Sequence, residues 1–155
     1  MGAHLDDADR RAITSLVHSY CTLIDDGDFD GFAGLFANGV WAVEGDPSGG
    51  DRGRDAVLQR LEQNVIRYDG GRPNTRHLTT NLELDGDSDA GTATGTCYVT
   101  VLQGVSPDFP LQPIFAGFYT DRFERRDGAW GFVERRIRPD LVGDLSRHRA
   151  DSITE

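Results

Sequence analysis

Two side chains that lie far apart in the sequence, His77 and Asp25, could together perform acid–base chemistry. His77 is the one histidine of four that falls inside a predicted β-strand, in the alternating segment 75–82 that follows the turn-forming run 70–74. If His77 faces a cavity, its imidazole can exchange protons near neutral pH and act as a general base. The alternative is an ordinary half-exposed strand histidine, and sequence spacing does not show whether the two side chains meet.

Asp25 stands near the end of a predicted helix over residues 6–25. The helix carries an apolar stripe at helical spacing, formed by Ile13, Leu16, Val17, Tyr20, Leu23 and Ile24. Gly27 is suited to cap its C-terminus, where the helix dipole disfavours the negative charges of Asp25 and Asp26. Solvation is enough to compensate Asp26. Asp25 lies off the centre of the stripe, so it reaches a cavity only if the end of the helix opens onto one.

Arg135 has an unusual position in the last predicted strand, residues 129–138. It alternates with Val133 and Ile137, and this register places all three side chains on the face of the strand that packs against the core. A buried guanidinium group requires an acidic or anionic partner. We give equal weight to two kinds of partner, a structural carboxylate and a substrate.

Aromatic residues on the predicted strands can form the walls of a cavity: Trp41, Tyr98, Phe115, Tyr119 and Phe132. Most aromatic side chains of a small domain belong to its core, so a cavity would use only some of these. Tyr98, and Tyr20 on the first helix, can also donate a hydrogen bond to a substrate oxygen. We therefore predict a substrate site that includes Tyr20, Trp41, Tyr98, Phe115 and Tyr119.

The composition excludes several kinds of chemistry and partner. The chain has 155 residues and a net charge of −10, and so acidic a protein is not expected to bind nucleic acid or an anionic membrane. All 16 basic residues are arginines, which excludes Schiff-base lysines and the lysine of a phosphate-binding P-loop. We expect a small-molecule substrate and no cofactor.

The sequence shows neither a metal site nor an export signal. The DxDxD run at 85–89 resembles a calcium loop but lacks the glycine and the terminal glutamate that such a loop needs. Cys21 and Cys97 are isolated, and we interpret them as small buried residues rather than metal ligands or disulfide partners. The N-terminal segment is acidic where a signal peptide is basic, and no apolar run approaches a membrane span, so we expect a cytoplasmic protein.

The order of the predicted elements indicates one α+β domain over residues 1–155, with a core at about 6–138 and a polar, frayed tail at 139–155. The helices come early, at 6–25, around the aromatic residues of 29–36, and at 55–66. The strands are predicted at 40–44, 75–84, 90–103, 114–125 and 129–138, with loops at 45–53 and 104–113. This order predicts a curved, mainly antiparallel sheet packed on three N-terminal helices. Because a broad face of such a sheet stays uncovered, we expect a homodimer or a homotrimer.

Several segments of the chain carry a resemblance to a known family. The longest is the hairpin 119–130, YTDRFERRDGAW, followed by Phe132. The others are WAVEG at 41–45, His77 with TNL at 80–82, and short matches at 12–13 and 23–25. Over about residues 10–138 the chain resembles a SnoaL-like protein of the nuclear-transport-factor-2-like superfamily, an α+β cone fold. Its nearest likeness is to the scytalone dehydratase and hexachlorocyclohexane dehydrochlorinase type.

The resemblance implies a dyad in which Asp25 and His77 fall on the family's positions, and it places Arg135 on an arginine of the pocket. Asp25 would orient the imidazole and stabilise its protonated form, while His77 would remove a proton from carbon. Arg135 or a tyrosine would stabilise the departing group or the developing oxyanion. These roles describe a cofactor-independent lyase or isomerase, similar to a dehydratase or a dehydrohalogenase, that acts on a small hydrophobic or polyketide-like substrate.

The chain also departs from the family pattern. Scytalone dehydratase has a second histidine on the strand that corresponds to 90–103, but this segment contains no histidine. Tyr98 would have to take over the role of that histidine. The segment 104–113 does not match the dehydrochlorinase, so the substrate of that enzyme is not assigned to this chain. A polyketide cyclase would use the same deprotonation to close a ring. A non-catalytic small-molecule-binding or accessory domain is the alternative from a different class, since one fold hosts many functions.

Overall fold

The computed structural model describes residues 2–150, and these form three helices and six strands. The helices are α1 (Asp7–Asp26), α2 (Phe29–Gly34) and α3 (Gly53–Asn64). Two short strands lie between α2 and α3, namely β1 (Val40–Val43) and β2 (Asp51–Arg52). Four long strands follow: β3 (Thr75–Asp87), β4 (Thr92–Val105), β5 (Phe109–Arg126) and β6 (Ala129–Val142).

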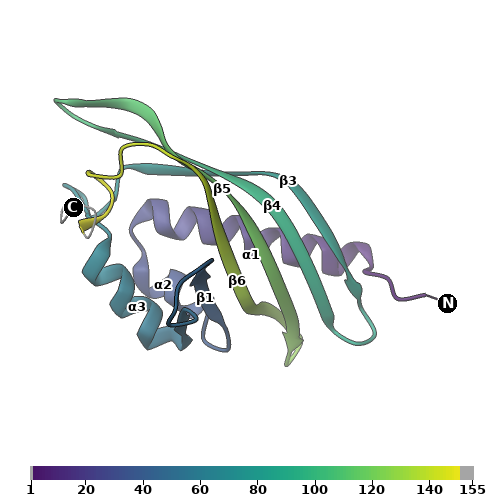
Figure 1. Cartoon of the computed structure of the whole chain (residues 1–155). Coiled ribbons are helices and arrows are strands. Elements are labelled where there is room, and N and C mark those ends of the chain that lie inside the picture. Colours follow the sequence, from purple (N-terminus) through teal and green to yellow (C-terminus); the bar gives the residue numbers. More distant parts are fainter. Residues whose placement is uncertain (1, 151–155) are drawn as a thin grey trace.

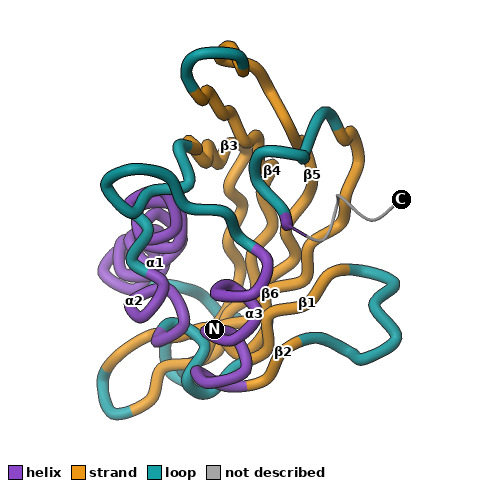
Figure 2. The backbone as a smooth tube through the Cα atoms, turned by 90° about the vertical axis from the view of Figure 1, so that its left-hand side faces the viewer, coloured by secondary structure: helices purple, strands orange, loops and turns teal. Residues whose placement is uncertain are grey.

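The strands form one sheet in the order β2-β1-β6-β5-β4-β3. Neighbouring strands are antiparallel except for β1 and β6, which run parallel. Figures 1 and 2 show that the sheet is curved and that α1 runs along one of its faces. The predicted fold class, α+β with a curved, mainly antiparallel sheet packed on N-terminal helices, is confirmed.

The sheet extends further than the side-chain pattern predicted. Most of the predicted loop 104–113 is strand, because β4 and β5 continue into a hairpin that projects from the rest of the sheet (Figure 1). The pairing becomes irregular beside Pro113, which has no N–H to donate. The two residues of β2 were also predicted as loop. Backbone pairing sustains both segments, although their side chains lack the alternation that marks a half-buried strand.

α1 packs its apolar stripe against the sheet, as the sequence predicts. Ile13, Val17, Tyr20 and Ile24 are buried, whereas the opposite side of the helix is exposed. Phe32 and Phe36, which follow at helical spacing, are fully buried and extend this apolar surface. Of the helices within residues 2–150, none is long and apolar enough to cross a membrane.

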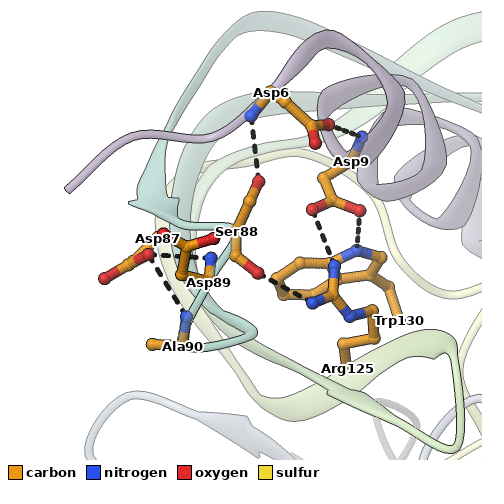
Figure 3. Close-up of polar contacts among 8 residues, drawn as sticks. All are labelled: Asp6, Asp9, Asp87, Ser88, Asp89, Ala90, Arg125 and Trp130. Carbon is orange, nitrogen blue, oxygen red and sulfur yellow. Dashed lines mark hydrogen bonds and ion pairs between the residues drawn. The ribbon is translucent and has the colours of Figure 1, made fainter.

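The N-terminal end of α1 is tied to two hairpins of the sheet through Asp9 (Figure 3). Its carboxylate accepts hydrogen bonds of 2.8 Å from both Arg125 and the indole N–H of Trp130, on β5 and β6. Arg125 also donates to the backbone carbonyl of Ser88 in the β3–β4 turn, at 2.7 Å. The Ser88 hydroxyl in turn accepts from the backbone N–H of Asp6. These bonds fix the direction in which α1 crosses the sheet.

The other end of α1 is fixed by Gly27. This residue adopts the left-handed conformation, with φ of 75°, and its N–H closes the helix by donating to the carbonyl of Ile24 at 3.0 Å. The turn before β3 approaches so closely that a methyl group on Gly27 would collide with the carbonyl oxygen of Gly71. The last turn of α1, which carries Asp25, is therefore held against the segment that leads into β3.

We predict that Gly27→Ala destabilises the protein more than Gly128→Ala does. Both glycines have a positive φ, 75° and 79°, where a side chain costs about 1–2 kcal/mol. Only at Gly27 would the added methyl group also meet backbone, since nothing lies within 4 Å of the corresponding position at Gly128. Urea unfolding of the two variants measures the difference, and equal losses of unfolding free energy would contradict this account of the helix end.

Candidate active site

Asp25 and His77 meet where the end of α1 lies over the start of β3. The Asp25 Oδ1 atom is 2.6 Å from His77 Nδ1, and Asp25 Oδ2 accepts the backbone N–H of His77 at 2.8 Å. The hydroxyl of Thr75 donates to Oδ1 at 2.8 Å. A carboxylate that accepts from Nδ1 holds the proton there, so Nε2 is left as the basic nitrogen of the ring.

The unfavourable position of Asp25 at a helix C-terminus is compensated by these three donors. Its side chain is 11% exposed and that of His77 is 8% exposed, so water contributes little. All three hydrogen bonds come from the first residues of β3. Asp26, by contrast, is exposed and forms a long ion pair of 3.7 Å with Arg72, as the solvation argument expects.

His77 borders a cavity of about 560 Å³ between the sheet, the helices and the segment after β6. Four of the five residues that the sequence assigns to substrate binding line this cavity: Tyr20, Trp41, Phe115 and Tyr119. Apolar side chains form much of the remaining wall, among them Val101, Ile137 and Leu145. The volume suits a small organic molecule.

Tyr20 and Tyr119 are buried residues at the wall of the cavity. The indole N–H of Trp41 donates to the Tyr20 hydroxyl at 3.1 Å, and the rings of Tyr20 and Tyr119 meet edge to face at 5.6 Å. Burial raises the pKa of both phenols, that of Tyr119 well above its ordinary value. Both tyrosines therefore keep their protons and can act as hydrogen-bond donors rather than as bases.

Arg135 is buried behind this wall and does not line the cavity. Its guanidinium group forms two hydrogen bonds of 2.8 Å with Asp121, and neither side chain has any solvent exposure. The same group lies over the rings of Tyr20 and Tyr119, 4.3 and 4.0 Å from their centroids. Of the two partners considered for Arg135, the structure contains the carboxylate. The position predicted for Arg135 at the substrate is corrected to one that supports the two tyrosines.

Tyr98 does not belong to the cavity. Cys97 and Val99 point into the core, and the alternation of β4 therefore directs Tyr98 to the outer face of the sheet, where it is 49% exposed. There it packs on Phe118, with ring centroids 5.9 Å apart. The prediction that Tyr98 contacts the substrate is corrected, and the alternation of Cys97, Val99 and Val101 in the sequence was the signal against it.

The chain after Pro139 returns to close the cavity. The backbone N–H of Ile66 donates to the carbonyl of His148 at 3.0 Å, and the Gln103 side chain donates to the carbonyl of Arg147 at 3.0 Å. A β-bridge joins Val65 to Arg149. The prediction of a frayed tail is wrong for residues 139–150; residues 151–155 lie outside the described part of the chain. These contacts have no periodic signal, so sequence patterns could not reveal them.

His148 is the functional candidate that sequence analysis missed. It lines the cavity, and its ring lies 6.4 Å from that of His77, measured between centroids. Burial, and next the nearby His77 and Arg149, lower the pKa of His148 to about 4, although Asp25 acts in the opposite direction. At neutral pH the cavity therefore contains a second, uncharged imidazole.

The remaining titratable groups offer no metal centre. Within residues 2–150, no three or more histidine, cysteine, aspartate or glutamate side chains are grouped so that they could hold a metal ion. Cys21 and Cys97 are buried and unpaired as disulfides. Burial raises their pKa values to about 11 and about 12, so both remain thiols at neutral pH.

The fold and site together define a class: a cone-like α+β domain in which a curved sheet and helices enclose an aspartate–histidine pair beside a mainly apolar cavity. The chain belongs to the SnoaL-like domain family, whose match covers residues 7–136. The resemblance expected from the sequence is thereby confirmed. No curated protein matches the chain significantly.

Solved structures with the same fold include proteins of known and unknown function. The chain is similar to the hexachlorocyclohexane dehydrochlorinase LinA-type3 from Novosphingobium barchaimii, at 26% identity and a TM-score of 0.66, over 87% of this chain and 88% of that one. A variant of the function-unknown protein Rv3472 from Mycobacterium tuberculosis has 28% identity and a TM-score of 0.72, over 88% and 79%. An NTF2-like protein with a cystatin-like fold from Novosphingobium aromaticivorans shares the fold, with 22% identity and a TM-score of 0.70, over 96% and 90%.

We predict that Asp121→Ala lowers the free energy of unfolding by about 3–5 kcal/mol, because it leaves the charge of Arg135 buried and unpaired. Asp140→Ala is the matched control, since it removes the carboxylate bound to the exposed Arg138. That surface change should leave stability unchanged within error. Chemical denaturation compares the two variants. A small loss for Asp121→Ala would mean that the buried pair does not hold the cavity wall.

A second prediction concerns His148 and pH. The unfolded chain protonates this imidazole near pH 6.5, whereas the folded protein does so only at about pH 4. The unfolded state therefore binds more protons in this interval, and stability is lost as the pH falls from 6.5 toward 4. The difference in unfolding free energy between wild type and His148→Asn should shrink by roughly 2–4 kcal/mol from pH 7 to pH 4. A difference independent of pH would show that His148 is not buried as a neutral base.

Proposed function

We propose that this protein is a cofactor-independent lyase that uses His77 as a general base to remove a proton from a carbon atom of its substrate. The observation that carries the proposal is the 2.6 Å contact between Asp25 and His77 Nδ1 beside the cavity. A histidine needed only for packing does not require a buried carboxylate that is itself satisfied by three donors. The similarity to a dehydrochlorinase at 26% identity supports the same class of chemistry.

In the proposed reaction, His77 Nε2 takes a proton from a substrate carbon as the electron pair of that C–H bond forms a C=C bond. The leaving group departs from the adjacent carbon with the electrons of its own bond, as hydroxide from an alcohol or as halide. Asp25 stabilises the imidazolium that forms, without taking its proton. The proton on Nε2 then passes to the hydroxide or to water, which restores the base.

The cavity walls have complementary tasks in this scheme. Trp41 and Phe115 provide apolar surface against which a small hydrophobic or polyketide-like substrate can be oriented. Tyr20 and Tyr119 retain their protons and offer hydrogen bonds to an oxygen on which charge develops. Arg135 acts on the substrate only indirectly, through Tyr20 and Tyr119, because its guanidinium group packs on both tyrosine rings.

The proposal predicts that the protein accelerates exchange of carbon-bound hydrogen in D₂O. 2-Tetralone is a suitable probe, because it is small and apolar and has acidic hydrogens beside its carbonyl group. His77→Ala should reduce the exchange rate, measured by proton NMR, by about 10²–10⁴-fold. Asp25→Asn should also reduce it strongly, because an amide N–H facing Nδ1 favours the wrong tautomer.

Tyr98→Phe is the matched control, since this residue lies on the outer face of the sheet and should leave the exchange rate unchanged. Exchange that is equally fast with His77→Ala, or a wild-type protein no faster than buffer, would remove His77 as the base. With a hydroxylated substrate, analysis of the product separates elimination from ring closure, because only elimination releases water without forming a new carbon–carbon bond.

A further inference from the structure

Asn64 is a polar residue of the cavity wall whose side chain has no partner within the described protein. It is the last residue of α3, it lines the cavity, and its side-chain amide forms no hydrogen bond within residues 2–150. The residue is half-buried, and its amide atoms are not among the polar atoms that are closed off from the surface. A molecule in the cavity can therefore reach this amide, which offers both a donor and an acceptor.

The fold holds Asn64 in place before any ligand arrives. Val57 and Leu61 of α3 are fully buried in the core. Arg60 stands one turn before Asn64, on the same side of the helix, and also lines the cavity. The guanidinium group of Arg60 binds Asp51 of β2 at 3.0 Å. Because α3 is anchored both on the core and on an edge of the sheet, the amide of Asn64 does not have to be ordered by the ligand.

Asn64 and His77 reach the cavity from different parts of the fold. β2, to which α3 is bound, and β3, which carries His77, are the two edge strands of the sheet. The ring of His148 lies 6.4 Å from that of His77, between centroids, and the carbonyl of His148 accepts the N–H of Ile66 near the end of α3. His148 thus separates the base from the helix end. A ligand that contacts both His77 and Asn64 presents a different end to each.

The charges that line the cavity select against an anionic ligand. Apart from the histidines, the charged residues of its wall are three carboxylates and two guanidinium groups, namely Glu44, Asp46, Asp51, Arg60 and Arg149. Asn64 also stands at the C-terminal end of α3, which carries partial negative charge, and no basic residue in the last turn offsets that charge. A neutral group with a hydrogen to donate suits these surroundings, whereas a carboxylate or a phosphate is repelled.

We propose that Asn64 is a specificity-determining residue, which binds a neutral hydroxyl group at the end of the substrate that lies away from the reacting carbon. The hydroxyl group donates to Oδ1 of the amide and accepts from Nδ2. This inference rests on the proposed function and extends it to a substrate class: ring compounds with a hydroxyl group that serves for binding and takes no part in the reaction. Free acids and phosphorylated compounds lie outside this class.

The test compares the binding of three naphthalene derivatives that differ in one substituent: 2-naphthol, 2-methylnaphthalene and 2-naphthoate. The hydroxyl and methyl groups are similar in size, so the first two compounds isolate the hydrogen bond. NMR titration of the protein at pH 7 gives the dissociation constants. Wild type should bind 2-naphthol about tenfold more tightly than 2-methylnaphthalene, which corresponds to one good hydrogen bond. It should bind 2-naphthoate more weakly than 2-naphthol.

Asn64→Leu keeps the size of the side chain but removes its polar atoms, and it should abolish the preference for the hydroxyl group. Asn64→Asp keeps an acceptor and should retain part of that preference. Gln63→Leu is the matched control, because it makes the same kind of change at the exposed neighbouring position and should keep the wild-type preference. In wild type, the side-chain amide signals of Asn64 should shift more with 2-naphthol than with 2-methylnaphthalene.

Three results would overturn the inference. The first is a wild type that does not prefer 2-naphthol to 2-methylnaphthalene, and the second is an unchanged preference in Asn64→Leu. The third is binding of 2-naphthoate as tight as that of 2-naphthol, which would contradict the neutral substrate class.

Failure of this inference can be told apart from failure of the proposed function. The preference for the hydroxyl group is measured by binding alone, whereas the role of His77 is measured by hydrogen exchange. If His77→Ala stops exchange but Asn64→Leu keeps the preference, only the role of Asn64 is wrong. If Asn64→Leu removes the preference but exchange does not depend on His77, Asn64 is a ligand contact and the proposed base is wrong.

Discussion

The carboxylate of Asp25 links the framework of this protein to its candidate chemistry. It stands at the C-terminal end of α1, where the helix dipole repels negative charge, and it is nearly closed off from water. Among residues 2–150, the donors to this carboxylate come from the start of β3, from Thr75 and from the backbone and ring of His77. Docking of the helix on the strand and orientation of the imidazole are therefore one interaction. Any change that separates the two elements leaves a buried charge unsatisfied and also releases the base.

A second buried charge organises the opposite wall of the cavity. Arg135 and Asp121 form two hydrogen bonds with one another within the sheet, and the flat guanidinium group then serves as a platform for Tyr20 and Tyr119. An arginine suits this position, because its planar group can bind a carboxylate along one edge while its face packs on aromatic rings. The ion pair thus supports two tyrosine rings of the cavity wall, although neither Arg135 nor Asp121 lines the cavity itself.

Sequence patterns located the elements and most of the cavity wall because these depend on local periodicity. The stripe of α1 and the aromatic spacing at Phe29, Phe32 and Phe36 correspond to buried faces. The contact between Asp25 and His77 could be expected only from family resemblance, since no local rule reports which strand a helix end will face. Tyr98 was wrongly assigned to the cavity, although the alternation of buried residues along β4 places it on the outer face. His148 was missed because isolated long-range hydrogen bonds, which have no sequence pattern, hold its segment. Periodic signals predict secondary structure and burial, but they do not predict where an irregular segment folds back.

The two histidines of the cavity lie in different surroundings. His77 has a carboxylate at Nδ1, which fixes the tautomer and stabilises the protonated ring, so its free nitrogen is suited to accept a proton. Within the described residues His148 has no such partner, and burial, followed by the proximity of His77, lowers its pKa to about 4, so its ring is neutral at neutral pH. A positively charged neighbour would oppose protonation of the base, whereas a neutral ring does not. Environments that differ in this way give two residues of one type different protonation chemistry. The second of these environments exists because the segment after β6 folds back against the cavity, where Leu145, His148 and Arg149 form part of its wall.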